Sequence, residues 1–290
     1  MVDEIIANAP YGKVERLSPL VRRVLARNPS AFTYTGTGTY IVGNGTVAVI
    51  DPGPNEPAHV EALIDALKGE TVSHIVVTHT HRDHSPAAVP LKSATGAPVV
   101  GCAPLALDDK GPKVEEGFDR TYAPDQVLAD GESVSGPDWT LTAVHTPGHT
   151  SNHLCFALAE EKVLFSGDHV MGWSTSVVTP PDGSMAAYMD SLRKLLDRDD
   201  ALYYPTHGAA VTEPKRLVRG LITHRKQREG QILKLLGQGA KPIPALVAVM
   251  YANVAPVLHP AAGRSVLAHL IDLHARGLVA VEGEQWSLAA

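Results

Sequence analysis

Apolar residues in the first 101 positions alternate between the spacing of β-strands and that of an α-helix. Two short apolar runs, residues 40–42 and 47–50, flank Gly43-Asn44-Gly45, and an Asn-Gly pair suits the tight turn of a β-hairpin. Residues 57–67 then carry apolar side chains at helical spacing, which stops near Gly69. The pattern continues with a strand at 72–78, a helix at 86–95 and a strand at 97–101. It therefore predicts a hairpin followed by alternating helices and strands.

The middle of the chain changes to short strands separated by turns, with one further helix. The strands are expected at 127–128, 139–145, 154–158, 163–165 and 201–204, and the helix at 185–196. A mixture of this kind predicts an α+β fold in which two packed sheets lie inside and helices lie outside.

The pattern after Thr212 is mostly helical. Helices are expected at 214–236, 245–254 and 261–276, followed by a small hairpin at 278–288. Helices followed by a two-stranded wing are the arrangement of a winged helix-turn-helix. We therefore predict a first domain at 1–212, a basic helical connector at 213–240 and a winged-helix domain at 241–290.

Composition limits the class of protein and its compartment. With 44% hydrophobic residues and a mean hydropathy of -0.02, the chain of 290 residues can bury a sizeable core, which excludes a disordered protein. No apolar stretch approaches the roughly 18–20 residues that span a bilayer. The N-terminus, Met1-Val2-Asp3-Glu4, is acidic where a signal peptide is basic. Cys102 and Cys155 lie in strand-like segments, which favours free buried thiols. We therefore predict a cytoplasmic protein that does not bind membranes.

Charge is distributed unevenly along the chain. The net charge is -6, yet residues 213–290 contain ten lysines and arginines against five acidic residues. The basic helical segment contributes Lys215, Arg216, Arg219, Arg225, Lys226 and Arg228. These residues indicate either an anionic partner, whose phosphates they would contact, or a solvated connecting helix.

The stretch THTHRDHS, residues 78–85, gathers three histidines and an aspartate directly after a buried strand. His79 and His81 are two residues apart and can converge on one cation, whereas Asp83 and His84 can turn toward a second. Imidazoles with one carboxylate suit Zn²⁺, and iron and manganese remain alternatives. An uncompensated cluster of this kind would be unfavourable to bury. The stretch therefore predicts a metal site.

Three later residues offer the further ligands that two metals require. His149, Asp168 and His207 each follow an apolar strand and sit beside glycine or proline. Taken singly, each has an ordinary interpretation as a residue of a turn or loop. Together they complete a set of seven candidate ligands with the residues of the first stretch.

This set resembles the metallo-β-lactamase fold family, whose H-x-H-x-D-H motif is met in full. The resemblance implies a four-layer αβ/βα sandwich with the metals at one edge, followed here by the winged helix. It assigns His79, His81 and His149 to the first metal, Asp83, His84 and His207 to the second, and Asp168 to both as a bridge. It also matches Asp51, after the first hairpin, to a structural aspartate.

The chemistry that follows is hydrolysis by two zinc ions through a metal-bridging hydroxide. Two divalent cations about 3.5–4 Å apart lower the pKa of a shared water and polarise a carbonyl or phosphoryl oxygen. Asp83 and His169 are the candidate catalytic residues, with His169 as a proton donor to the leaving group or a strand-end structural residue. Trp173, Tyr188 and Arg225 are candidates for substrate binding. His153 is expected to support a ligand.

Residues along nearly the whole chain resemble the subgroup named beta-lactamase-like protein 2. The similarity includes residues 11–51, 148–156, His224-Arg225, residues 266–270 and 283–288. The characterised animal members of that subgroup are endoribonucleases on single-stranded RNA, which implies the same activity here. Gly38 stands where the subgroup often has asparagine.

Two other functions are also consistent with the sequence. The first is hydrolysis of a carbonyl ester, by a thioesterase of the glyoxalase II type, a lactonase or a weak β-lactamase. Thr80 interrupts the usual run of three histidines of the glyoxalase II type. The second is a metal-sensing winged-helix regulator without enzyme activity. In each case the winged helix can also form a homodimer contact.

Overall fold

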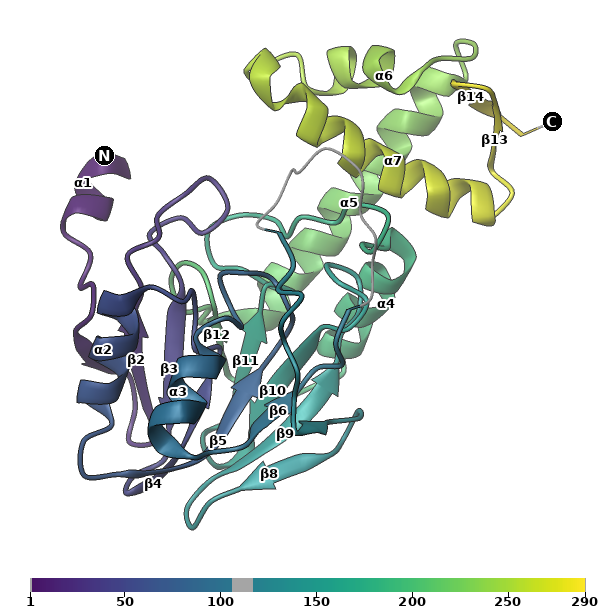
Figure 1. The fold of residues 1–290 in the computed structure, drawn as a ribbon. Helices are drawn as coiled ribbons and strands as arrows, with labels where there is room; N and C mark the ends of the chain where they lie inside the picture. Colours follow the sequence, from purple (N-terminus) through teal and green to yellow (C-terminus); the bar gives the residue numbers. More distant parts are fainter. Residues whose placement is uncertain (1, 106–116, 290) are drawn as a thin grey trace. The chain divides into compact units, whose positions relative to one another are not determined.

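The computed structural model describes residues 2–105 and 117–289, which form two compact units (Figure 1). The first unit contains Met1–Thr146, Asn152–Thr175 and Asp199–Pro214, and the second contains Pro147–Ser151, Ser176–Arg198 and Lys215–Ala290. The short segment 147–151 and the helix that follows 184 thus group with the C-terminal residues. The boundaries expected at 212 and 240 stay predictions.

The first sheet of the first unit has seven strands in sequential order. These are β1 (Val14–Arg16), β2 (Val21–Leu25), β3 (Gly38–Val42), β4 (Thr46–Ile50), β5 (Thr71–Val77), β6 (Val99–Gly101) and β7 (Gln126–Val127). Pairing is antiparallel from β1 to β4 and parallel from β4 to β7. Parallel neighbours need a crossover, and α2 (Pro57–Ala66) and α3 (Ala88–Thr95) supply the first two. A short helix, α1 (Val2–Ala7), precedes the sheet.

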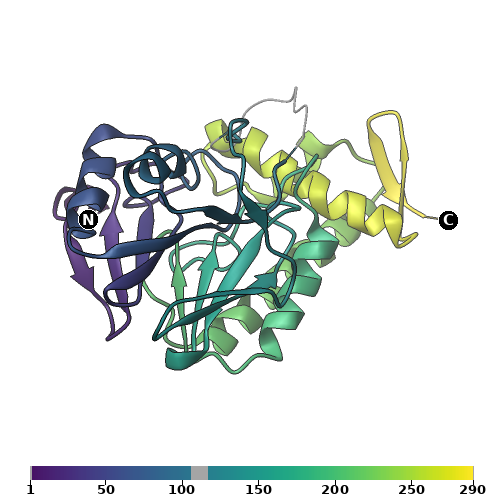
Figure 2. The same ribbon diagram turned by 60° about the horizontal axis from the view of Figure 1, so that its bottom comes forward.

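The second sheet has five strands in the order β12-β11-β10-β9-β8. Their bounds are Ser133–Ser135 for β8, Thr140–His145 for β9, Leu154–Leu158 for β10, Val163–Gly167 for β11 and Leu202–Pro205 for β12. A 3₁₀ turn, η1 (Ala159–Glu161), joins β10 to β11, and β11 and β12 are parallel. Figure 2 shows the two sheets of this unit as separate groups of strands.

One apolar core lies between the two sheets and includes residues of both. Ile41 and Val76 come from the first sheet, and Phe156 and Phe165 from the second. Trp139 is buried at the start of the second sheet, and its indole N–H donates to the carbonyl oxygen of Thr46 at 2.9 Å. The sheets are therefore joined by polar contacts as well as by packing.

A second set of polar contacts joins the sheets at the opposite ends of their strands. The Tyr40 hydroxyl on β3 donates to the carbonyl of Pro205, and the Gly38 amide donates to the carbonyl of Thr206. The Leu154 amide on β10 donates to the carbonyl of Thr78. These contacts hold together the strand ends from which the candidate ligands extend.

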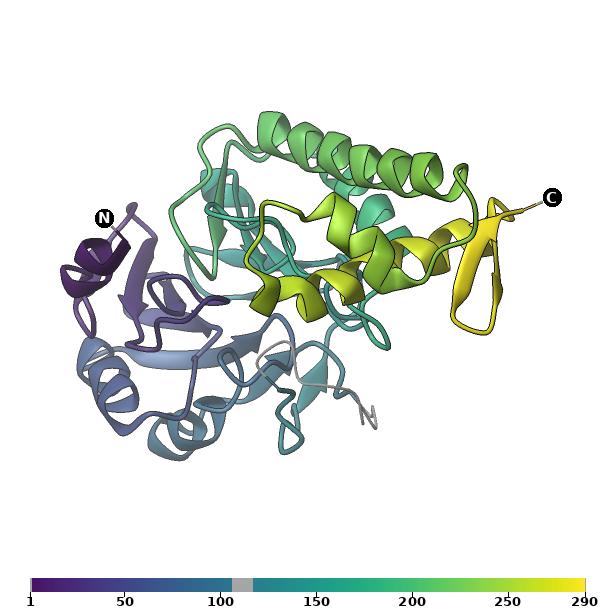
Figure 3. The same ribbon diagram turned by 90° about the horizontal axis from the view of Figure 1, so that it is seen from above.

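The second unit is helical with a small β-hairpin. It contains α4 (Met185–Leu196), α5 (Pro214–Leu236, of which Pro214 groups with the first unit), α6 (Ile243–Met250), η2 (Pro256–Leu258), α7 (His259–Ala275), β13 (Val279–Glu282) and β14 (Gln285–Leu288). A separate core holds α5, α6, α7 and the hairpin together through residues such as Leu236, Leu246, Leu270 and Trp286. Figure 3 shows α5 and α7 as its two long helices.

The structure confirms the predicted order of elements and corrects several details. Helix 185–196 and the hairpin around Asn44 lie where they were expected. Helix α6 was expected at 245–254, but it spans Ile243–Met250. Strands β1, β2 and β8 were not predicted. Cys102 and Cys155 are free and buried, as expected. None of the described helices is long and apolar enough to cross a membrane.

Candidate metal centre

Six of the seven candidate ligands belong to the first unit and lie just beyond strand ends. His79, His81, Asp83 and His84 follow β5, Asp168 follows β11, and His207 follows β12. All six are at least 92% buried, because Asp168, the most exposed, retains 8% of its surface. Since β11 and β12 are parallel, their carboxyl ends meet at one edge of the sheet.

The donor atoms of these residues converge. His84 Nε2 lies 3.5 Å from carboxylate oxygens of both Asp83 and Asp168. His207 Nε2 lies 3.0 Å from Asp83 and 3.4 Å from Asp168. On the other side, His79 Nε2 is 2.9 Å from His81 Nδ1. Two groups of three therefore form, His79 with His84 and Asp168, and Asp83 with His84 and His207, each with donor atoms within 4.8 Å of one another.

Asp51 fixes the orientation of His84. Its Oδ2 accepts a hydrogen bond from His84 Nδ1 at 2.8 Å and further bonds from the hydroxyls of Thr78 and Thr206. Its Oδ1 accepts from the Thr78 amide. Because the Nδ1 proton of His84 is engaged, the lone pair of Nε2 faces Asp83 and Asp168. Asp51 has a φ of 48°, a left-handed conformation that the surrounding hydrogen bonds must maintain.

His207 is oriented by a backbone carbonyl in the same way. Its Nδ1 donates to the carbonyl oxygen of Gly36 at 3.1 Å, which leaves Nε2 toward the two carboxylates. His153 holds the backbone at Asp168, because its Nε2 accepts from the Asp168 amide at 3.2 Å. This contact agrees with the supporting role expected for His153.

Electrostatic coupling within the cluster shifts four pKa values. Burial opposes charge on every member, yet the histidines and carboxylates stabilise one another. Beyond the effect of burial, His84 and His207 lower the pKa of Asp83 to about 2 and that of Asp168 well below its usual range. The carboxylates in turn raise the pKa of His207 to about 10 and that of His84 well above its usual value. A site of this kind favours the binding of a metal cation, because the cation can replace the protons that the site holds.

The donor set fits divalent metal ions. Buried imidazoles and carboxylates are the ligands of zinc, iron and manganese sites. His84 Nε2 is buried and makes no hydrogen bond among the described residues, which an unshared ligand lone pair explains. The cluster of histidines and aspartates is therefore able to bind metal.

His149, the seventh candidate, belongs to the second unit. It is 6% exposed, and its Nδ1 donates to the carbonyl oxygen of Val177 at 2.7 Å. This contact leaves Nε2 as the atom for coordination, as in His84 and His207.

His59 closes the turn that carries Asp51. It extends from α2, is 3% exposed, and its Nε2 donates to the carbonyl oxygen of Pro52 at 3.0 Å. Burial lowers the pKa of His59 to about 4, although the bond to Pro52 acts in the opposite direction. The ring is therefore neutral in the folded protein at pH values where it is protonated in the unfolded chain.

This difference predicts a loss of stability in weak acid. His59 takes up a proton near pH 6.5 in the unfolded chain and only near pH 4 in the folded protein. Its contribution to the free energy of unfolding is therefore complete above pH 6.5 and falls as the pH drops from 6.5 to 4. From pH 7 to pH 5 the contribution of His59 to the free energy of unfolding should fall by about 2 kcal/mol. We expect a His59→Gln variant, which keeps a donor for Pro52, to lose that much less. Urea unfolding of both proteins at pH 7 and pH 5 measures the difference, and equal losses contradict the assignment.

The other candidate site residues differ in exposure. His169 is completely buried, with its ring centroid 5.9 Å from that of His153, and its role as an acid stays a prediction. Trp173 is half-buried and stacks on Tyr34 at 4.9 Å, and it packs against Gly208, the residue after His207. Tyr188 and Arg225, both of the second unit, are buried together, with the guanidinium 5.2 Å from the ring centroid.

Two aromatic residues near the cluster were not predicted. Phe118 stacks on the His81 ring at 4.7 Å, and Tyr34 forms the stack with Trp173. Neither lies in a motif, and the segment around Phe118 has no strand or helix periodicity. Only the folded arrangement places these rings beside candidate ligands.

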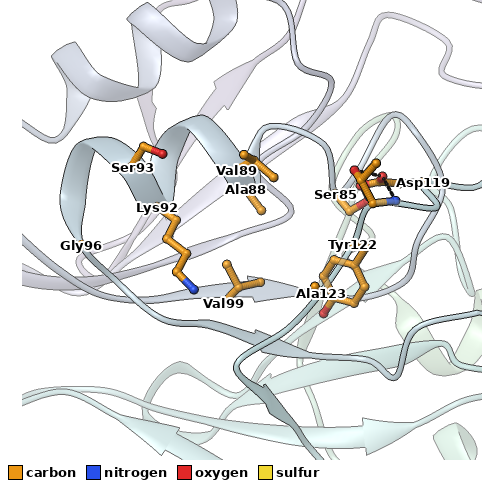
Figure 4. Close-up of a pocket in the computed structure, with 11 residues that line it drawn as sticks. Ser85, Ala88, Val89, Lys92, Ser93, Gly96, Val99, Asp119, Tyr122 and Ala123 are labelled. Atoms are coloured by element: carbon orange, nitrogen blue, oxygen red, sulfur yellow. Dashed lines mark hydrogen bonds between the residues drawn. The ribbon is translucent and has the colours of Figure 1, made fainter.

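A surface cavity of about 470 Å³ lies between α3 and residues 119–123, next to the ligand stretch (Figure 4). Two of its polar side chains are paired with neighbours: Ser85 donates to Asp119 at 2.8 Å, and Lys92 pairs with Asp125. The remaining wall includes Ala88, Val89 and Tyr122. The cavity therefore offers a mainly apolar surface and is separate in chemistry from the histidine and aspartate cluster.

A two-sheet fold with buried histidines and aspartates at its strand ends defines a metal-dependent hydrolase. The sequence model of the metallo-beta-lactamase superfamily matches residues 34–207, and that of the beta-lactamase associated winged helix domain matches residues 243–286. This chain belongs to the metallo-β-lactamase superfamily. The predicted fold class, the recognised family and the hydrolase class are thereby confirmed.

Relatives support both parts of the chain. The beta-lactamase-like protein 2 homolog of Drosophila melanogaster is 35% identical to this chain. The match covers 92% of this chain and 92% of the relative. An atrochrysone carboxyl ACP thioesterase of Paecilomyces divaricatus is 33% identical over 86% of this chain and 75% of its own.

Solved structures share the fold. A beta-lactamase domain protein from Burkholderia ambifaria has a TM-score of 0.79 at 21% identity, covering 98% of this chain and 96% of its own. A protein crystallised in a di-iron-bound form has a TM-score of 0.51 at 26% identity, covering 70% of this chain and 96% of its own. Family membership alone therefore does not fix which metal is bound.

Proposed function

We propose that this chain is a dinuclear zinc hydrolase of acyl thioesters and related carbonyl esters. The observation that carries the proposal is the convergence of five residues whose donor atoms form two overlapping groups of three, each within 4.8 Å, namely His79, Asp83, His84, Asp168 and His207. We assign His79, His81 and His149 to one metal, Asp83, His84 and His207 to the other, and Asp168 to both. Two cations held by these residues would supply a Lewis acid for a carbonyl oxygen and a water of lowered pKa.

The residues of the chain prepare this site for reaction. Asp51 and the Gly36 carbonyl accept the Nδ1 protons of His84 and His207, so Nε2 is the atom of each ring that would coordinate a metal. Asp83 is charged throughout the physiological range, because its pKa is lowered to about 2, so it can accept a proton only from a strongly acidic group. The rings of Phe118 and Trp173 offer apolar contacts for the acyl part of a substrate.

The thioester class is favoured by the relatives and by the aromatic neighbours of the cluster. Among relatives of 33–34% identity, several carry the name of an acyl carrier protein thioesterase. An acyl group attached through a thioester is apolar and uncharged, which suits contacts with Phe118 and with the Tyr34–Trp173 stack.

We further propose that the protein is cytoplasmic and that it forms a homodimer.

A second candidate function is cleavage of single-stranded RNA. It is favoured by the resemblance to beta-lactamase-like protein 2 and by four exposed basic residues of α5. Those residues are Lys215, Arg216, Arg219 and Lys226. Arg225 and Arg228 fit phosphate contacts less well, because Arg225 is buried and Arg228 lies 4.8 Å from the Tyr251 ring.

Parallel assays distinguish the two functions. We expect the zinc-loaded protein to hydrolyse an acyl thioester, and we expect a chelator or the His81→Ala substitution to remove that activity. A lactone, a chromogenic β-lactam and a labelled single-stranded RNA serve as competing substrates. RNA cleavage that His81→Ala abolishes, with the thioester intact, would replace the first proposal by the second. Fewer than two metals per chain after loading would contradict the dinuclear centre.

A further inference from the structure

The loop that carries His149 is fixed to α4 within the second unit. The Ser184 amide donates to the Gly148 carbonyl at 2.9 Å, and the Ser191 hydroxyl donates to the Pro147 carbonyl at 2.8 Å. Gly148 has a φ of 143°, and a Cβ there would lie 2.3 Å from the Cα of Tyr188. The loop therefore lies directly on the first turns of α4, where no side chain at position 148 fits.

The imidazole of His149 is held by the segment that precedes α4. Its Nδ1–H donates to the carbonyl oxygen of Val177 at 2.7 Å, so Nε2 keeps its lone pair. The position of the Val177 carbonyl therefore sets the direction of the Nε2 lone pair. Any movement of this peptide changes the ring orientation directly.

Arg225 of α5 holds the neighbouring peptide of the same segment. Its guanidinium donates to the carbonyl oxygen of Ser176, one residue before Val177. Arg225 is only 4% exposed, and its guanidinium lies over the ring of Tyr188, the residue that packs on Gly148. Arg264 of α7 donates to the carbonyl of Pro180, so a second C-terminal arginine contacts this segment.

The burial of Arg225 is not explained by an ion pair. Among the described residues its guanidinium contacts a carbonyl and an aromatic face but no carboxylate. Burying a guanidinium without a counter-ion costs free energy, which the hydrogen bond to Ser176 and the contact with the Tyr188 ring offset. The guanidinium holds the Ser176 carbonyl and contacts the Tyr188 ring, which packs on the His149 loop.

We propose that Arg225 is a positioning residue for His149, through the Ser176 and Val177 peptides and through Tyr188. The inference rests on the proposed assignment of His149 as a metal ligand. It gives the C-terminal helix α5 a role in metal binding, because the residue that orients this ligand lies 76 positions later in the chain. Loss of a contact that orients a ligand typically weakens metal binding by about 10–100-fold.

The test compares Arg225→Gln with Lys226→Gln, which removes the same charge from an exposed neighbouring position of α5. Chelator competition measures the affinity of each zinc, and ¹⁵N NMR of labelled histidine follows the Nδ1–H of His149. For Arg225→Gln we expect one zinc to bind about 10–100-fold more weakly, together with loss or broadening of that resonance. Lys226→Gln should match the wild type in both measurements. Wild-type affinity and an unchanged resonance in Arg225→Gln would overturn the proposal.

Two further variants complete the test. Arg225→Lys retains one donor for the Ser176 carbonyl but not the planar contact with Tyr188, so we expect partial recovery of zinc affinity. If Arg225→Gln does not fold, Arg225→Lys is the deciding variant, and wild-type zinc affinity in Arg225→Lys overturns the proposal.

His149→Ala distinguishes failure of the ligand assignment from failure of the positioning role. If it binds both zinc ions as the wild type does, the ligand assignment itself fails, whereas weaker binding in His149→Ala but not in Arg225→Gln defeats only the positioning role.

Discussion

Replacing His84 with alanine is expected to remove the second metal from the protein and to abolish hydrolysis. We assign His84 to that metal, and its Nε2 lies 3.5 Å from both Asp83 and Asp168. The substitution also leaves the Asp51 carboxylate buried without one of its donors. The loss of metal affinity should therefore exceed the roughly 10–100-fold loss that is typical when an outer contact of a ligand is removed.

Metal content after gel filtration and the rate of ester hydrolysis measure this effect. Asp51→Asn should give an intermediate result, since it keeps every candidate ligand and weakens the hydrogen bonds that Asp51 accepts from His84, Thr78 and Thr206. His274→Ala, at an exposed histidine of α7, should retain full metal content. A His84→Ala protein that still holds two metals per chain would contradict the assignment of this residue as a ligand.

The second large effect concerns stability rather than chemistry. Trp139 is 1% exposed, packs between the two sheets and donates from its indole nitrogen to the Thr46 carbonyl. Trp139→Ala should lower the free energy of unfolding by about 3–5 kcal/mol, because it leaves a cavity and an unpaired carbonyl. Thermal unfolding of the metal-free protein should then shift downward by about 10 °C.

A matched substitution identifies the cause of this loss. Trp139→Phe fills most of the cavity but cannot donate to Thr46, so it should recover most of the packing energy and leave a deficit of about 1–3 kcal/mol. The exposed Val127→Ala substitution, at 49% exposure, should change stability by less than about 0.5 kcal/mol. A Trp139→Ala protein as stable as Val127→Ala would show that the sheets do not depend on this side chain.

The sequence predicts most of this fold because its elements have strong local patterns. The Asn44 turn and the amphipathic helix at 185–196 are examples. Strand β2 was missed because Arg22 and Arg23 interrupt its apolar residues. Arg22 pairs with Glu70, which is distant along the chain, and Arg23 pairs with Glu15 on the neighbouring strand. No local sequence pattern predicts these two ion pairs.

The candidate site is predicted to a similar extent. The histidines and aspartates stand out because their types and spacing are rare outside metal sites, and the structure brings six of them together. The aromatic side chains of Phe118 and Tyr34 carry no such signal. Arg225 illustrates a different limit, since its place in a basic segment suggests exposure, whereas packing against Tyr188 buries it.

The Asp51 carboxylate has a consequence for the order of events during synthesis of the chain. It bonds to residues 27, 33 and 155 positions later, namely Thr78, His84 and Thr206. Contacts so far apart in sequence form late, because closing long loops is slow. A ribosome-bound chain that ends before Thr206 lacks both the last bond to Asp51 and His207. Binding of both metals should therefore follow the docking of the second sheet, so a newly made protein that holds them has already brought its two sheets together.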